Sequence, residues 1–157
     1  MDDEKKTARA VDIYSRLCKM LDERGWGYTS SDEELVIDFT VWGDDLDMRL
    51  KIFVIAERQL IRLLSPLPFH IKPDNSVNMS AAVVYVNSIL GDGSFNYDVE
   101  SGLIVYRMTA SFLDSDIGEG LLQYMVDCST NTVDKYNDRL FAVSLGYLSL
   151  TDFLEGK

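Results

Sequence analysis

Residues 75 to 90 read NSVNMSAAVVYVNSIL and contain no charged residue. We expect the rest of the chain to pack around this segment. Its apolar residues recur at helical spacing, so it predicts an α-helix, which Gly91-Asp92-Gly93 ends. The residues that we assign to the core or to a dimer face are Met79, Ala82, Val83, Tyr85, Val86, Ile89 and Leu90. A helix that is apolar nearly all round must be covered on more than one side, so we expect it at the centre of the molecule.

Two further helices are expected, one near each end of the chain. Residues 4 to 24 carry an apolar stripe at helical spacing and stop at Gly25, a residue that favours the left-handed conformation of a helix end. Asp116 is expected to begin the last long helix, with Glu119 in the spacing of a capping box, and Gly146 to end it. The tail of residues 147–157 keeps large apolar side chains, which indicates that it docks on the domain.

Strands are predicted wherever apolar and polar residues alternate. The predicted strands are residues 35–42, 48–55, 60–65, 95–99 and 103–112. Ser65-Pro66-Leu67-Pro68 is expected to end the third strand, because prolines cannot serve in a central ladder. The order α-βββ-α-ββ-α predicts a two-layer α+β domain, with a five-stranded antiparallel sheet and three main helices.

Composition and charge narrow the class of protein. A chain of 157 residues is expected to form one domain, 1–157, with its core at about 10–148. Its net charge of −11 repels a phosphate backbone, so a nucleic acid is an unfavoured partner. We expect a cytoplasmic location without membrane contact, because neither a signal peptide nor a long apolar run is visible. Cys18 and Cys128 are interpreted as buried, reduced thiols.

The sequence predicts no enzyme, no cofactor and no metal site. His70 is the single histidine, and with two cysteines it does not make a zinc motif. The run from Asp114 to Glu119 begins like a calcium loop, but Met125 stands where the bidentate glutamate belongs. Turn and cap chemistry therefore explains these residues. A small-ligand sensor, which remains an alternative, would need a pocket near His70 and the turn at residues 44–47.

Basic side chains gather on one predicted sheet face. Alternation along the strands places Arg49, Lys51, Arg62 and Arg107 on the face opposite the main apolar set. With a two-residue turn between the second and third strands, Lys51 and Arg62 would be direct cross-strand neighbours. The face is either a site for a protein partner, where arginine is favoured, or a solvated surface with local ion pairs, for example to Asp38. An accessory protein that binds nucleic acid through this face is a further alternative.

A set of short stretches resembles a known family. They are Gly43-Asp44-Asp45-Leu46, Arg62-Leu63-Leu64-Ser65-Pro66-Leu67-Pro68-Phe69, Gly91-Asp92-Gly93-Ser94-Phe95-Asn96-Tyr97-Asp98, Tyr106-Arg107-Met108-Thr109 and Thr132-Val133-Asp134-Lys135-Tyr136. Together they resemble the YbjN family, bacterial proteins described as sensory transduction regulators. The resemblance implies a fold similar to type III secretion chaperones, which are commonly homodimers that bind partner polypeptides. It supplies no catalytic residue.

We therefore expect a non-enzymatic, chaperone-like or regulatory module that binds an unidentified protein partner and forms a homodimer. A second subunit would cover, across a two-fold interface, the apolar surface of the helix at residues 75–90. In the alternative arrangement, the first and last helices cover this surface within one subunit.

Overall fold

A six-stranded antiparallel sheet forms one layer of the protein, in a computed structural model that describes all of residues 1–157. The strands are β1 (Thr29–Ser31), β2 (Val36–Trp42), β3 (Asp47–Ile55), β4 (Leu60–His70), β5 (Ser94–Asp98) and β6 (Leu103–Ser111). Their order across the sheet is β1-β2-β3-β4-β6-β5, so neighbours in the chain are neighbours in the sheet except where β6 lies between β4 and β5. The helices are α1 (Asp3–Glu23), α2 (Ser76–Ile89), α3 (Glu119–Ser144) and α4 (Leu150–Leu154), with a 3-10 turn at Pro73–Asn75.

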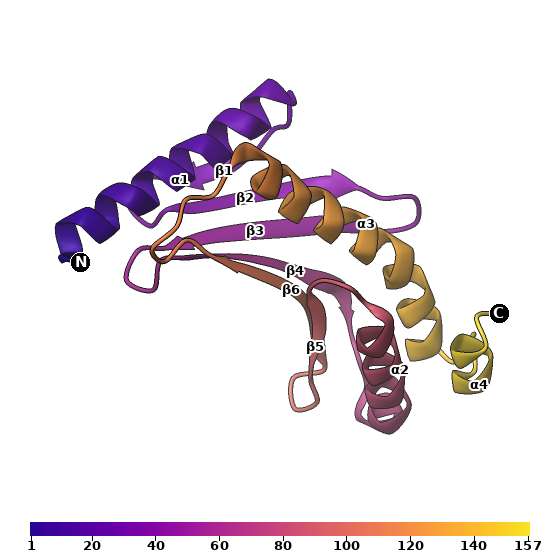
Figure 1. The fold of residues 1–157 in the computed structure, drawn as a ribbon. Coiled ribbons are helices and arrows are strands. Elements are labelled where there is room, and N and C mark those ends of the chain that lie inside the picture. The colour runs from indigo at the N-terminus through magenta and orange to yellow at the C-terminus, as the bar shows by residue number, and fades with distance from the viewer.

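The helices form the second layer, on one face of the sheet (Figure 1). The long helix α3 crosses β3, β4 and β6, while α1 lies against β3 and α2 against β5. Alternate side chains of the strands and the apolar sides of the helices form one continuous core of 36 buried residues. The predicted α+β antiparallel class is confirmed, with β1 and α4 as two short elements that the sequence did not predict.

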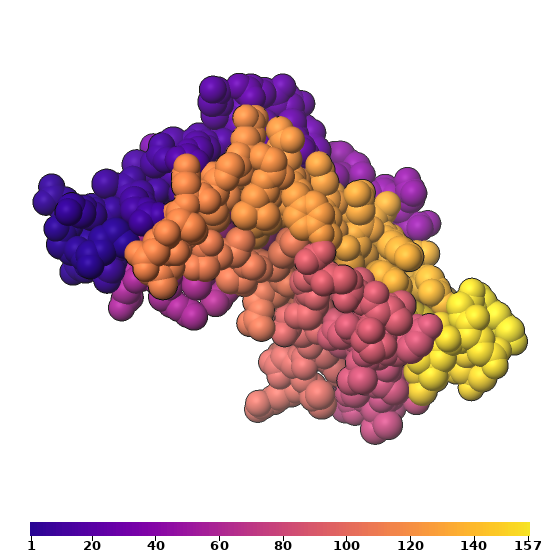
Figure 2. Space-filling model, in the orientation of Figure 1, coloured from indigo at the N-terminus to yellow at the C-terminus, as the bar shows by residue number.

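The position of α2 differs from the expectation of a central helix. One side of α2 is buried, through Met79, Ala82, Val83 and Val86, whereas Tyr85 and Leu90 are half-buried. Its other side is open to solvent: Val77 is 79 %, Val84 70 % and Ile89 54 % exposed. Figure 2 shows α2 at the surface of the molecule. The expectation was wrong because α3, the longest helix, takes the position over the middle of the sheet and leaves α2 at its end.

Strand β4 continues through both prolines, against the prediction that they end it. Pairing with β3 stops at Leu64, and the register with β6 shifts between Pro66 and His70. The missing proline amides therefore fall where the ladder is irregular or has ended, and there a proline costs little. The extension carries Leu67 and Phe69 into the core beneath α3.

The start of α3 also differs from the prediction. Its N-cap is Gly118, without a side-chain hydrogen bond, so the capping box from Asp116 to Glu119 does not form. The Asp116 carboxylate instead accepts from the Ile117 amide and from Arg16, each at 3.0 Å. The helix ends near Gly146 as predicted, and the tail docks through Phe153, which is fully buried.

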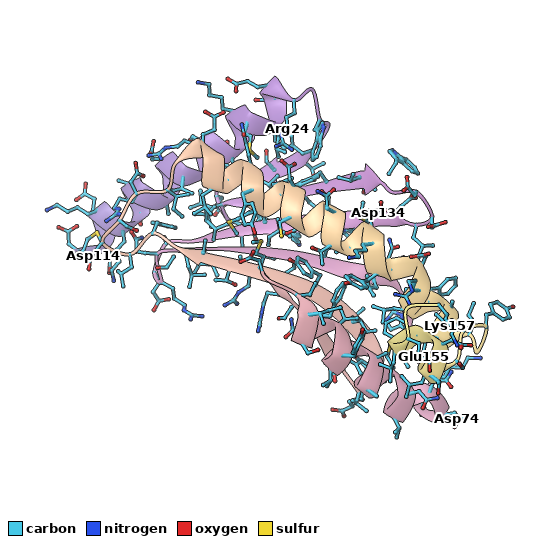
Figure 3. The ribbon with its side chains drawn as sticks, turned by 45° about the vertical axis from the view of Figure 1, so that its right-hand side comes forward. Arg24, Asp74, Asp114, Asp134, Glu155 and Lys157 are labelled. Carbon is cyan, nitrogen blue, oxygen red and sulfur yellow. The ribbon has the colours of Figure 1, made fainter.

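Two arginines of α1 hold the connection between β6 and α3, and Arg24, the C-cap residue of α1, holds α3 itself. Arg9 donates to the Phe112 carbonyl at 2.7 Å, and Arg16 donates to the Ile117 carbonyl at 2.6 Å. Arg24, which Figure 3 labels, follows the end of α1. It makes a bidentate pair with Asp127, at 2.7 Å from Nη1 to Oδ1 and 3.0 Å from Nη2 to Oδ2. Because these contacts span about 100 residues of sequence, they fix α1 to α3 and complete the helical layer on a single face of the sheet.

Candidate functional site

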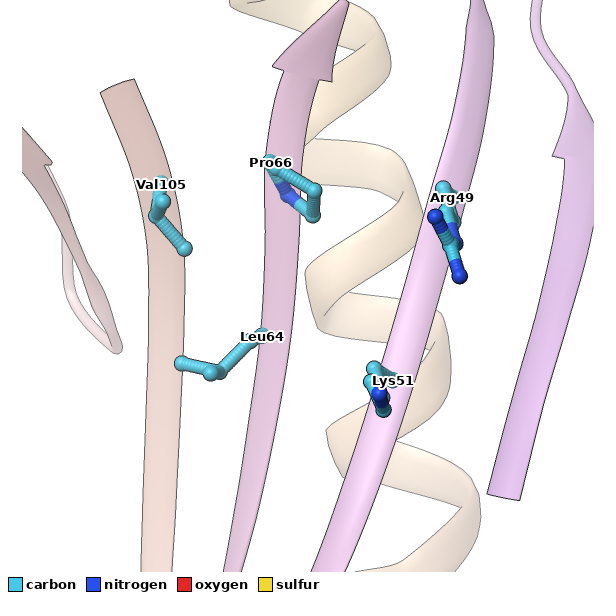
Figure 4. A pocket seen from close by; sticks show the side chains of 5 residues that line it. All are labelled: Arg49, Lys51, Leu64, Pro66 and Val105. Carbon is cyan, nitrogen blue, oxygen red and sulfur yellow. The ribbon is translucent and has the colours of Figure 1, made fainter. Parts of the chain in front are cut away.

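Because the helices pack on one face of the sheet, the other face carries no helix (Figure 1). We call it the open face. Its members are the outward side chains of the four central strands: Asp38, Thr40, Arg49, Lys51, Phe53, Arg62, Leu64, Pro66, Val105, Arg107 and Thr109. Each is half-buried or exposed, whereas their chain neighbours on the other face belong to the core. Figure 4 views the sheet from this side, with α3 behind the strands. The period of two along a strand produces this division.

The basic residues singled out by sequence all lie on the open face, but their register differs from the prediction. Leu64 is opposite Lys51 on one side and Arg107 on the other. Arg62 is opposite Phe53, so Lys51 and Arg62 are diagonal neighbours rather than a direct pair. The difference arises because the connection between β3 and β4 spans residues 56–59, which makes it two residues longer than the turn that the prediction required.

A shallow depression lies in the middle of this face (Figure 4). It is lined by Arg49, Lys51, Leu64, Pro66 and Val105 and has a volume of about 190 Å³. Pockets for small ligands start at roughly 300 Å³, so this one suits a single side chain. Sequence did not assign Leu64 or Pro66 to this site. Pro66 was expected to lie beyond the end of the strand.

The four cations of the open face differ in their partners. Arg49 makes a bidentate pair with Asp38, at 2.7 Å from Nη2 and 3.2 Å from Nε, and this hydrogen bonding raises the pKa of Arg49. The local ion pair to Asp38 that the sequence suggested is therefore present, with Arg49 as its partner. Lys51 lies 5.4 Å from the centre of the Phe53 ring and has no carboxylate partner. Arg62 and Arg107 have neither a hydrogen bond nor an ion pair, and the Arg62 Nε is buried without an acceptor.

The other candidate residues do not converge. His70 is exposed at the end of β4, and the turn at residues 44–47 is held beneath α3, where the Asp44 amide donates to Asp134 Oδ1 at 3.0 Å. Figure 3 labels Asp134 on α3. The main surface depressions contain neither His70 nor Asp44. No cluster of three histidine, cysteine or acidic residues is placed to bind a metal ion. None of the helices combines the length and apolar character of a membrane span.

The fold and the open face define an α+β protein with a single helical layer. Several solved structures have a similar fold. One is YbjN from E. coli, described as a proposed transcription regulator, with 14 % identity, a TM-score of 0.59, and coverage of 82 % of this chain and 89 % of that chain. Another is the ExsC–ExsE complex, with 14 % identity, a TM-score of 0.59, and coverage of 82 % and 93 %. The resemblance in fold that the sequence motifs indicate is thereby confirmed. No family model and no curated protein sequence matches the chain.

Proposed function

We propose that this protein is a non-enzymatic, chaperone-like or regulatory module that holds a segment of a partner polypeptide on its open face. The observation that carries this proposal is the sheet face itself. It lacks a covering helix, yet it presents apolar side chains such as Phe53, Leu64 and Val105 beside cations without partners. One of the structures with a similar fold is a complex of two polypeptides, ExsC and ExsE, which supports the same reading.

The shape of the open face favours a polypeptide over a small molecule. Its depression holds one side chain and is continuous with the exposed surface of three strands. An apolar centre with arginines around it is the composition found at protein interfaces, where a few buried anchors provide most of the binding energy. A partner chain that crosses the strands places one anchor in the depression and its polar groups around the rim.

Capture from the native host tests this function. The variant Leu64→Glu places a charge in the depression, and Val11→Glu places the same charge on α1, where Val11 is 44 % exposed on the helical layer. We expect Leu64→Glu to lose partner polypeptides that the wild type and Val11→Glu retain, as measured by quantitative mass spectrometry. Circular dichroism verifies that both variants fold. Equal recovery by all three proteins would contradict the proposal.

We also propose that the protein is a homodimer in which α2 packs against the α2 of a second copy. The motivating feature is its exposed apolar stripe, Val77, Ala81 and Val84, on a helix without a charged residue. Because the chain carries a net charge of −11, an uncharged surface is the one at which two copies meet with least repulsion. A two-fold axis beside α2 brings the same stripe from both copies together, and it leaves the open face free.

A further inference from the structure

We infer that the open face selects acidic segments of a partner, in which two carboxylates flank an apolar side chain. This inference rests on the proposed function and specifies the chemistry of the occupant. The carboxylates pair with Lys51, Arg62 and Arg107, and the apolar side chain enters the depression beside Leu64 and Pro66.

The geometry sets the pattern of the segment. Lys51, Leu64 and Arg107 form one row across β3, β4 and β6, with Arg62 two residues from Leu64 on the same strand. Because strands lie about 4.8 Å apart, the backbones of Lys51 and Arg107 are about 10 Å apart, on either side of one apolar position. In an extended peptide, alternate side chains point to the same side and are spaced about 7 Å apart. A sequence of acidic, any, apolar, any, acidic residues therefore matches the row, because long basic side chains reach outward to the flanking carboxylates.

The charge distribution of the chain supports this choice. Five arginines donate to carboxylates or to main-chain carbonyls: Arg9, Arg16, Arg24, Arg49 and Arg139. The arginines without any such bond are Arg58, Arg62 and Arg107, and the last two are neighbours on the open face. In a chain with 26 acidic residues, Arg62 and Arg107 have no carboxylate at ion-pair distance, whereas Asp38 lies opposite Lys51 on the neighbouring strand. The buried Nε of Arg62 is a donor without an acceptor, so no group of its own chain holds this guanidinium by a hydrogen bond at that atom.

Two other occupants fit less well. A second copy bound through the open face of both molecules would place cations opposite cations, which is unfavourable. A nucleic acid repeats its negative charge along the whole strand, so it also meets the rest of a protein with a net charge of −11. A peptide confines its carboxylates to the few positions that face Lys51, Arg62 and Arg107.

A direct binding experiment uses the full chain and two fluorescein-labelled peptides. One peptide repeats the order glutamate, serine, leucine, serine, which puts its glutamates and leucines on the same side of an extended chain, and the other is its glutamine isostere. We expect the acidic peptide to bind more tightly in fluorescence anisotropy at low salt, and the preference to disappear as salt screens the charges. The double variant Arg62→Gln/Arg107→Gln should weaken binding of the acidic peptide about tenfold, since exposed ion pairs contribute about two- to fivefold each. Lys51→Gln should act in the same direction.

The control variant is Arg58→Gln, which removes one charge from an unpaired arginine at the turn between β3 and β4, just as Lys51→Gln removes one charge from the row. We expect it to change the affinity by less than about twofold, because its charge lies outside the row. Equal binding of the two peptides, or equal losses in Arg58→Gln and Lys51→Gln, would overturn the inference. So would tighter binding of a single-stranded oligonucleotide that depends on Arg62 and Arg107. If Leu64→Glu still abolishes partner capture in these cases, the proposed function stands and the acidic occupant alone is rejected.

Discussion

Gly93 is a residue whose conformation the fold constrains from two directions. It has a φ of +70°, and a β-carbon at this position would overlap the phenol of Tyr106, whose hydroxyl donates to the Asp92 carbonyl at 3.0 Å. We expect Gly93→Ala to lower the free energy of unfolding by about 2–4 kcal/mol through left-handed strain and overpacking. Chemical denaturation measures the change. Gly91→Ala is the control, because its β-carbon meets no atom within 4 Å, and a loss as large as that of Gly93→Ala would refute the explanation.

The burial of Tyr106 leads us to expect that the protein becomes less stable at alkaline pH. Burial raises the pKa of this phenol from 10.0 to about 12. Its folded pKa lies above its unfolded value, so the contribution to stability is complete below pH 10.0 and is lost as the pH rises through about 12. We expect the free energy of unfolding to fall across this interval, and to fall less steeply in Tyr106→Phe. Identical pH slopes for the two proteins, from denaturant titrations, would contradict the assignment.

At the scale of single residues, sequence identified the basic members of the open face but not their mutual positions. Alternation along a strand is a local property, so Arg49 and Arg62 could be assigned to one face without coordinates. The partner of Lys51 depends on the length of the turn at residues 56–59, which no local pattern determines. The buried, unsatisfied Nε of Arg62 depends on tertiary packing and has no sequence signal.

Among the elements, α2 protects the edge of the sheet. Asn87 donates to the Phe95 carbonyl and accepts from the Phe95 amide, both at 2.8 Å, so its side chain occupies the position of a further strand beside β5. We expect Asn87→Ala to cost about 1–2 kcal/mol of unfolding free energy and to speed amide exchange in β5. Hydrogen exchange measures the second effect. The control is Asn78→Ala, an exposed position of the same helix, which should leave β5 unchanged; equal exchange in both variants would exclude the role of Asn87.

The elements that sequence misjudged are those decided by their neighbours. The composition of α2 predicted a helix correctly, but its place depended on the competition with α3 for the centre of the sheet. The prolines of β4 were interpreted as a strand end, although they fall where pairing with β3 has stopped. Sequence did not single out Arg9 and Arg16 of α1 or its C-cap Arg24. Their acceptors Phe112, Ile117 and Asp127 lie about 100 residues away.

For the whole molecule, the dimer proposal makes a prediction about size. Val84 is 70 % exposed on α2, so Val84→Asp is not expected to disturb the fold of one chain. In the proposed dimer it would bury two carboxylates against each other, which is strongly unfavourable. We expect light scattering at micromolar concentration to give a dimer for the wild type and a monomer for Val84→Asp. A wild-type monomer at this concentration would contradict the proposal for α2.

The layered architecture could be predicted from the order of elements and the period of each, and the motifs indicated the fold. That the open face carries no helix could not be predicted from the sequence. Strands show the same alternation whether a helix or solvent covers their outer side. What decides it is the set of long contacts that draw α1 and α3 to one side, such as the pair between Arg24 and Asp127.

Photo-cross-linking in the native host tests most directly whether the open face holds a partner polypeptide. A benzophenone amino acid replaces Val105 in the depression of the open face, or Leu121 on α3, which is 39 % exposed on the helical layer. We predict that irradiation attaches a discrete polypeptide at Val105 and none at Leu121, and that Leu64→Glu in the same chain removes the product. Cross-links at Leu121 without any at Val105 would show that the helical layer binds the partner, and would contradict the account.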